Sequence, residues 1–385
     1  MKHGFDVLIL GAGASGLMCA AELRRNSRLN IGVIEGNSVA GKKLAISGGG
    51  RCNITNIEVS PEHFLGEDAF VAEVFEHFGN EDLLNYLHRH AIALELRKER
   101  YYFCREGAKA IVALLLQRAG GTDFFYDTHI HSVTPIPQGY RVHTDRGDFD
   151  AATLVIATGG ESYRSIGASA IGIKLAQELQ LQTTPFTPAL VGLTLQKEQF
   201  WMKTLSGTSC NVRIRVGNKC IEEEMLFAHK GISGPAVLSA SLYWSKGEIE
   251  IDFLPHEELH VFLNSKKLLS TALPLSKRFM KTFLEHIGVE DMPGHRLNAS
   301  MLMRLKRLKS YTFAPAGNFG FSKAEVSRGG IDVCELDART LMSRRHANLY
   351  CIGEVVDITG ELGGYNFQWA FSSATVCARH ICKKN

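Results

Sequence analysis

The stretch FDVLILGAGASG at residues 5–16 decides the fold of this chain. Its apolar half predicts a short buried strand, and its glycine half predicts a tight turn into a helix that continues through residues 17–25. Gly11 allows the turn, Gly13 lets the backbone approach a pyrophosphate, and Gly16 lets the helix pack closely on the strand. The free N–H groups at the start of such a helix favour a bound anion.

A second strand, predicted at residues 31–34, ends in Glu35. Glu35 lies 19 residues after Gly16, a spacing at which its carboxylate can accept hydrogen bonds from ribose hydroxyls. The two strands and the helix therefore predict a dinucleotide-binding βαβ unit. Glu35 disfavours a 2′-phosphate because two anions would meet, so FAD or NAD fits better than NADP. The βαβ unit alone leaves the choice between FAD and NAD open.

Composition indicates an ordinary globular protein. The chain has 385 residues, 45% of them hydrophobic and 22% charged, which is enough for two or three domains. The net charge of +3 indicates neither nucleic acid nor a membrane surface as partner. We interpret the basic cluster Arg304, Lys306, Arg307 and Lys309 as a solvated helix face. Nothing in the pattern specifies an oligomeric state.

The nine cysteines include no C-x-x-C pair, which argues against both a disulfide framework and a zinc site. We therefore expect a reducing, cytoplasmic location. Four histidines, His63, His77, His88 and His90, fall in a region of residues 61–118 that we predict to be mostly helical, and their spacing fits no metal site. The sequence predicts no bound metal.

A second glycine-rich segment, GKKLAISGGGRCNITN, occupies residues 41–56. Three consecutive glycines disfavour a regular helix or strand and suggest backbone pressed against a ligand, although a flexible surface loop is the alternative. Lys42, Lys43 and Arg51 flank the glycines and can neutralise phosphates.

The doubly wound pattern continues in two later segments. Residues 154–160 and 349–354 each predict a buried strand that ends in a glycine turn, and a glycine-rich turn at 360–366 precedes a closing helix. Between them, alternating strands and then short helices predict a separate module. We expect one domain from residues 1–190 and 322–385, and an inserted substrate or cap domain from 191–321.

No catalytic motif of a hydrolase is visible, so a cofactor must carry the difficult chemistry. The chain resembles the BaiN/RdsA-type (YhiN-like) NAD(P)/FAD-dependent oxidoreductases. The resemblance lies in the two glycine-rich segments, in the turns at 157–160 and 231–235, and in the runs at 353–357 and 363–366. That family includes aminoacetone oxidase. The resemblance implies an α/β, Rossmann-like, two-dinucleotide-binding-domain flavoprotein fold with an inserted mixed β-barrel-like and helical module.

The resemblance also implies FAD bound without a covalent bond, with NAD(P)H as a transient reductant and a small molecule as substrate. The residues that it assigns to FAD come from all of the glycine-rich segments: Gly11, Gly13, Ala14, Ser15, Gly16, Glu35, Gly36, Lys42, Lys43, Leu44, Gly49, Gly50, Arg51, Cys52, Asn53, Ile130, Ala157, Thr158, Gly159, Gly160, Gly353, Glu354, Gly364, Tyr365, Asn366 and Phe367.

Five residues are candidates for catalysis or for binding the substrate. His229, Tyr163 and Tyr365 are possible acid–base groups, and Arg51 can bind an anionic substrate group, as can Arg164. Each has a structural alternative: a histidine in a turn, tyrosines that pack on the flavin, and arginines that bind flavin phosphate or an acid. The chain departs from the family pattern at 102–105, 164, 167–172 and 227–229, so a relative's substrate does not transfer on resemblance alone.

Three functions follow from these expectations. The first is a hydride transfer between a small organic substrate, or NAD(P)H, and FAD. The second is an oxygen-dependent oxidase of an amine similar to aminoacetone. The third is a non-catalytic, FAD-binding regulatory or RNA-associated protein, for which the basic cluster at 304–309 is the only support.

Overall fold

The computed structural model describes residues 3–384, which divide into two compact units. Unit 1 comprises the chain up to Thr187 and from Val326 onward, and unit 2 comprises Pro188–Glu325. These divisions fall a few residues from the domain boundaries expected from the sequence, and each unit is described by itself.

Unit 1 contains a seven-stranded sheet in which five strands run parallel. The parallel strands are β7 (Asp123–Phe125), β2 (Ile31–Ile34), β1 (His3–Leu10), β10 (Gly147–Ile156) and β20 (Leu349–Cys351). The antiparallel pair β9 (Gly139–Thr144) and β8 (Ile130–Ile136) extends the sheet beyond β10. This arrangement confirms the predicted α/β, Rossmann-like fold.

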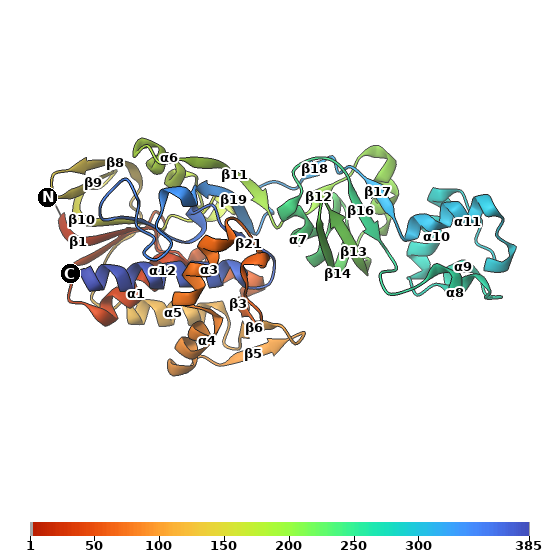
Figure 1. The fold of residues 1–385 in the computed structure, drawn as a ribbon, viewed down its shortest axis with the longest axis horizontal. Helices are drawn as coiled ribbons and strands as arrows, with labels where there is room; N and C mark the ends of the chain where they lie inside the picture. The colour runs from red at the N-terminus through yellow and green to blue at the C-terminus, as the bar shows by residue number, and fades with distance from the viewer. Residues whose placement is uncertain (1–2, 385) are drawn as a thin grey trace. The chain divides into compact units, whose positions relative to one another are not determined.

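Helices cover the sheet because their apolar sides are buried against it. The helix α1 (Ala14–Asn26) contacts both α12 (Tyr365–Lys384) and α5 (Ala108–Arg118) (Figure 1). The three helices are far apart in the sequence, since α1 lies near the N-terminus, α12 near the C-terminus and α5 between them. The α1 side chains Leu17, Met18 and Leu23 are fully buried. Gly16 fixes the start of α1, since a Cβ there would lie 1.9 Å from the carbonyl oxygen of Gly11.

The region at 61–118 is mostly helical, as predicted, but a β-hairpin that the sequence analysis did not predict interrupts it. Helices α3 (Asp68–His77) and α4 (Asn80–Arg89) precede a hairpin of β5 (Leu94–Arg97) and β6 (Tyr101–Cys104), which pairs with β3 (Asn53–Asn56). Strands of four residues are too short for their alternation to stand out from a helical period.

Unit 2 contains a seven-stranded antiparallel sheet and a helical part. The sheet order is β17 (Tyr311–Phe313), β16 (Ile249–Asp252), β13 (Ser209–Val216), β14 (Lys219–Ala228), β15 (Gly231–Ser233), β12 (Leu193–Thr194) and β18 (Gly317–Asn318). One hydrophobic core joins the sheet to the helices through aromatic side chains such as Phe253, Phe279, Phe283 and Tyr311.

The remaining elements are short. In unit 1 they are α2 (Lys42–Ile46), η1 (Ser47–Gly50), η2 (Pro61–His63), β4 (Phe64–Leu65), η3 (Arg164–Ile166), α6 (Ile171–Glu178), β11 (Thr183–Ala189, which runs two residues into unit 2), β19 (Val326–Ile331), η7 (Val333–Glu335), η8 (Gly353–Val355) and β21 (Thr359–Gly360). In unit 2 they are η4 (Lys197–Leu205), α7 (Pro235–Tyr243), α8 (Leu259–Leu263), α9 (Leu269–Ala272), α10 (Lys277–Ile287), η5 (Gly294–Arg296), α11 (Ala299–Leu305) and η6 (Lys306–Leu308). Within residues 3–384 no helix combines the length and the hydropathy that crossing a membrane requires.

The contact between Gly16 and Gly11 yields a stability prediction. We expect Gly16→Ala to destabilise the protein by about 1–3 kcal/mol, because its Cβ must displace backbone rather than a flexible side chain. Gly13→Ala is the matched control, since a Cβ there meets nothing within 4 Å. Thermal unfolding of the two apo variants measures the difference, and equal midpoints would contradict the predicted close approach.

Candidate cofactor site

Four turns meet at one edge of the parallel sheet. Leu10 is in register with both Ile34 and Ile156, and Ile156 is in register with Cys351, so the four strands end at the same level. Each strand is followed by one of the segments that the sequence singled out, namely 11–16, 35–37, 157–160 and 353–354. Ligands of open α/β sheets bind at this carboxyl edge.

The first turn presents unpaired backbone donors to this edge. Gly11 has a φ of +106°, which favours glycine, and the helix α1 starts at Ala14 with Gly13 as its N-cap. No side chain caps the helix, so the first N–H groups, including those of Ala14 and Ser15, remain available to an anion. Gly353 approaches the same helix start so closely that a Cβ there would lie 2.5 Å from Ser15 Oγ.

Glu35 is held rigidly at the end of β2. Its Oε2 accepts a hydrogen bond from the Ala12 N–H at 2.8 Å, and its Oε1 accepts from the backbone and side-chain N–H of Asn37 at 2.9 and 2.8 Å. A carboxylate has lone pairs for further donors, so this geometry leaves capacity for ribose hydroxyls. The chain returns beside Glu35 at Thr128, whose N–H donates to the Glu35 carbonyl, two residues before Ile130 begins β8.

Glu354 connects the two ends of the chain. Its carboxylate forms an ion pair of 2.8 Å with Lys43 and accepts the Ser327 N–H at 2.9 Å. A Cβ on Gly160 would lie 2.6 Å from Glu354 Oε1, so only glycine fits at the end of the 157–160 turn. Lys42 donates instead to the Asn37 side chain at 3.2 Å, and Leu44 is buried.

The glycine run at 48–50 faces open space. All three glycines have φ values between +56° and +85°, and a Cβ on Gly49 or Gly50 would meet nothing within 4 Å. Arg51 is exposed, and among residues 3–384 its guanidinium has no hydrogen-bond or ion-pair partner. Cys52 is buried, and burial raises the pKa of its thiol to about 12, so it is no nucleophile. Asn53 then starts β3.

The last glycine turn leads into α12. Gly364 has a φ of +93° and lies so close to β3 that a Cβ would be 2.7 Å from Thr55 backbone atoms. Asn366 closes the turn by exchanging two hydrogen bonds with the Gly360 backbone at 2.8 and 2.9 Å. The helix itself begins at Tyr365, and Phe367 is half-buried on it.

Tyr365 is fully buried, and desolvation raises the pKa of its phenol to about 12. The His63 ring stacks on the Tyr365 ring at 4.6 Å between centroids, and His63 Nδ1 lies 3.2 Å from the Glu361 carboxylate. No local pattern predicts this group, because 298 residues separate His63 from Glu361. A candidate ring partner for Tyr365 was therefore missed.

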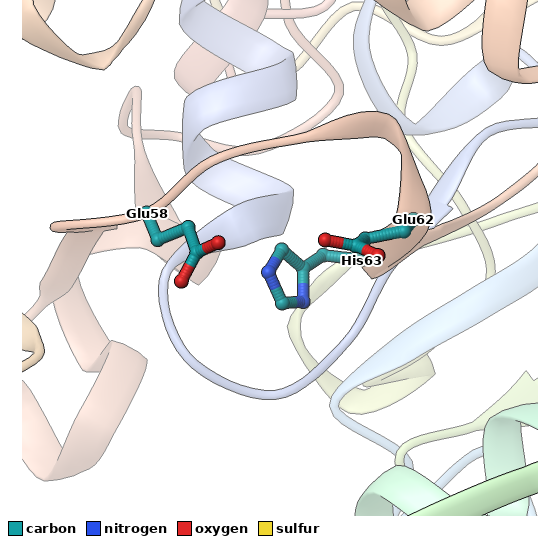
Figure 2. A group of neighbouring side chains, drawn as sticks. All are labelled: Glu58, Glu62 and His63. Carbon is teal, nitrogen blue, oxygen red and sulfur yellow. The ribbon is translucent and has the colours of Figure 1, made fainter.

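His63 also lies near two exposed carboxylates (Figure 2). Potential ligand atoms of Glu58, Glu62 and His63 all lie within 4.8 Å of one another. Both carboxylates are exposed, and Ser60 already donates to Glu62 at 3.1 Å. We assign no metal to the group, and the expected absence of a metal stays a prediction.

The other candidates for catalysis are placed as follows. Tyr163 has a φ of +67° and follows the buried Ser162 at the end of the 157–160 turn. Arg164 forms an ion pair with Glu161, which is the structural alternative considered for it. His229 is exposed in the turn between β14 and β15 of unit 2. Thr158 Oγ1 is buried and has no hydrogen-bond partner in the described structure.

These residues fit FAD. The uncapped helix start with an open Gly13 suits a pyrophosphate, and the fixed Glu35 suits an adenosine ribose. Glycines with open space at 48–50 and a second helix start at Tyr365 extend the site beyond a mononucleotide. The assignment of the single residues to FAD stays a prediction.

Comparisons with known proteins agree with this fold. A model described as "HI0933-like protein Rossmann domain" matches residues 5–380. "Ribosomal RNA dihydrouridine synthase" of Escherichia coli is 36% identical over 98% of both chains, and the Haemophilus influenzae protein of the same name is 34% identical over 100% of both. "3-dehydro-bile acid delta(4,6)-reductase" of Clostridium scindens is 28% identical over 98% of both.

Solved structures show the fold alone. A quinol-fumarate reductase crystallised with menaquinol has a TM-score of 0.55 at 14% identity, over 100% of this chain and 71% of that one. The 3-ketosteroid delta1-dehydrogenase of Sterolibacterium denitrificans has a TM-score of 0.53 at 11% identity, over 100% of both chains.

The open space at Gly13 yields a test of the site. We expect Gly13→Val to fold normally but to lose FAD, because the added branches occupy the path to the helix start. The ratio of flavin absorbance to protein absorbance in purified protein measures the loss, which we expect to be about tenfold or more. Full flavin occupancy of a folded Gly13→Val variant would show that the site is misplaced.

Proposed function

The chain belongs to the HI0933-like family of Rossmann-domain proteins and is a flavin-dependent oxidoreductase, and we propose that it reduces the C5=C6 double bond of uridine in ribosomal RNA. The single observation that carries this proposal is the end-to-end similarity to the Escherichia coli ribosomal RNA dihydrouridine synthase, at 36% identity over 98% of both chains.

The names of the relatives share one type of reaction. Dihydrouridine formation saturates a carbon–carbon double bond conjugated to the C4 carbonyl of uracil. A 3-dehydro-bile acid delta(4,6)-reductase acts on double bonds that are conjugated to a 3-keto group. Both substrates need a hydride at one alkene carbon and a proton at the other. This common chemistry supports a reductase of conjugated alkenes over a protein without catalysis.

Non-covalently bound FAD supplies the acceptor and donor of the hydride in this proposal, with NAD(P)H as the source of the electron pair. The chain itself supplies binding and orientation. The α1 start and the glycines at 11–16 would hold the pyrophosphate, and Glu35 would hold the adenosine ribose. Lys43 and Ser327 fix the orientation of Glu354, which suits a contact with the ribityl hydroxyls.

The proton must come from a group that stays protonated beside the substrate. Tyr365 meets the first condition, because its raised pKa keeps the phenol neutral throughout the physiological range. Its position at the start of α12, against His63, supports a role as proton donor or as a residue that orients one. Arg51 has an unpaired guanidinium, which suits an anionic substrate group such as a phosphate.

A second candidate is the reduction of a small conjugated enone, which the similarity to the Clostridium scindens reductase favours. The oxygen-dependent amine oxidase expected from the family resemblance stays a prediction. Oxygen uptake driven by an amine, without NAD(P)H, would distinguish the oxidase from either reductase.

The proposed function predicts a defined product. Holoenzyme with NADPH or NADH should add two hydrogens to a uridine of deproteinised ribosomal RNA, which nucleoside mass spectrometry detects as dihydrouridine. The Gly13→Val variant, which lacks FAD, should form none. If ribosomal RNA gains no dihydrouridine while a steroid enone is reduced under the same conditions, the small-molecule alternative replaces this proposal.

The pKa of Tyr365 predicts the pH dependence of the reduction. A buried phenol with a pKa of about 12 donates equally well from pH 6 to 9, so the single-turnover rate should be flat in that range. A donor with the ordinary pKa of a histidine side chain would instead lose rate as the pH rises through about 6.5. Tyr365→Phe should lower the rate by about 10²–10⁴-fold while FAD stays bound. A rate that falls near pH 6.5 and survives Tyr365→Phe would exclude Tyr365.

A further inference from the structure

The helical part of unit 2 is strongly basic. We define the helical lobe as residues 259–309, which contain the elements from α8 to η6 (Figure 1). The lobe has ten lysine and arginine residues against three aspartate and glutamate residues. The rest of the chain has 33 against 37, so the modest net charge of +3 averages a positive lobe with a negative remainder.

The lobe's positive charges are mostly not neutralised by the protein. Six exposed cations have no hydrogen-bond or ion-pair partner within residues 3–384, namely Lys266, Lys267, Lys277, Lys281, Arg296 and Lys306. By contrast, Lys309 forms an ion pair of 2.9 Å with Asp252 and serves the fold. The sequence-based view of the 304–309 cluster as one solvated face is therefore wrong for Lys309.

The positive charges on α10 lower the stability of the helix itself. Lys277 and Arg278 lie in the first turn, which contains no acidic residue, so they oppose the positive end of the helix dipole. Lys281 lies four residues after Lys277, on the same side of the helix, where two like charges repel. An anionic partner would offset these costs.

The structure favours a polyanion over a lipid surface. An amphipathic helix that binds a membrane needs a free apolar face. The apolar residues of α10, including Phe279, Met280 and Phe283, are instead fully buried in the core of unit 2. The lobe's exposed apolar side chains are Val261, Leu268 and Met303, and they come singly from α8, from the segment before α9 and from α11. The α10 helix offers charge to solvent, and such cations attract the phosphate backbone of nucleic acids.

We propose that the helical lobe binds the phosphate backbone of RNA. The inference rests on the proposed function, because ribosomal RNA is then the polyanion that the enzyme must hold. It departs from the expectation, drawn from net charge, that nucleic acid is not a partner. The lobe would give binding that is independent of base sequence and steeply dependent on salt, whereas the chemistry at uridine belongs to unit 1.

The test compares two triple variants of the FAD-loaded, full-length protein. The lobe variant carries Lys266→Gln, Lys277→Gln and Lys281→Gln. The matched control carries Arg28→Gln, Arg118→Gln and Arg146→Gln, which remove the same charge from exposed positions of unit 1. Binding of deproteinised ribosomal RNA is measured between 50 and 200 mM salt. In a plot of log K against log salt, each phosphate contact contributes roughly one unit to the slope.

We expect the lobe variant to bind at least about tenfold more weakly at low salt, with a slope of log K against log salt smaller by about two to three. The control variant and a triple Lys→Arg variant should bind as wild type, and every variant should keep its flavin. The proposal would be overturned if the lobe and control variants bound RNA equally well. It would also be overturned if the wild-type protein did not bind RNA.

The two proposals fail separately in this experiment. Suppose that the lobe variant loses RNA affinity and that the wild-type enzyme forms no dihydrouridine. This result supports the RNA surface and contradicts the proposed function. Suppose instead that the lobe variant forms dihydrouridine and binds RNA as the wild type does. This result contradicts the RNA surface and supports the proposed function.

Discussion

The register of the parallel strands is the constraint on which the site depends. Because β1 pairs in parallel with both β2 and β10, and β10 pairs with β20, the four strands must end at one level. The turns after them are thereby brought together although they come from positions 11, 35, 157 and 353. The ion pair of Lys43 with Glu354 and the contact of Gly353 with Ser15 then close this edge. A slip of one strand would separate all of these groups at once.

Local chemistry explains how much of the site the sequence could predict. Gly11, Gly16 and Glu35 lie within one βαβ unit, so their predicted roles follow from spacing and backbone sterics. The structure shows the tight turn at Gly11 and the close approach at Gly16, whereas the ribose contact of Glu35 stays a prediction. The stack of His63 on Tyr365 depends on a contact 302 residues apart in the chain, which no local pattern contains. The hairpin of β5 and β6 was missed for a different reason, since its strands are too short to show a period.

Charge shows why a whole-chain average predicts partners poorly. A net charge of +3 describes neither the helical lobe nor the rest of the chain, because the lobe carries an excess of seven positive charges and the rest an excess of four negative ones. Electrostatic binding depends on the local density of charge within about 10 Å, the screening length at 0.1 M salt. Residues 259–309 are contiguous in the chain and pack on one core, so their cations concentrate positive charge in one part of unit 2.

The choice between RNA and a small enone as substrate depends on which residues bind the part of the substrate that does not react. The conjugated alkene is common to uracil and to a 3-keto steroid, so the reacting group alone does not discriminate between them. A steroid gains its binding energy from buried apolar area, whereas an RNA gains much of it from phosphates that release counterions. The six cations of the lobe that have no partner within residues 3–384 would contribute nothing to a bound steroid, but they would stabilise a bound RNA. The proposed RNA surface therefore agrees with the similarity to the two ribosomal RNA dihydrouridine synthases, and the proposed site in unit 1 would need only to accept a flat conjugated ring.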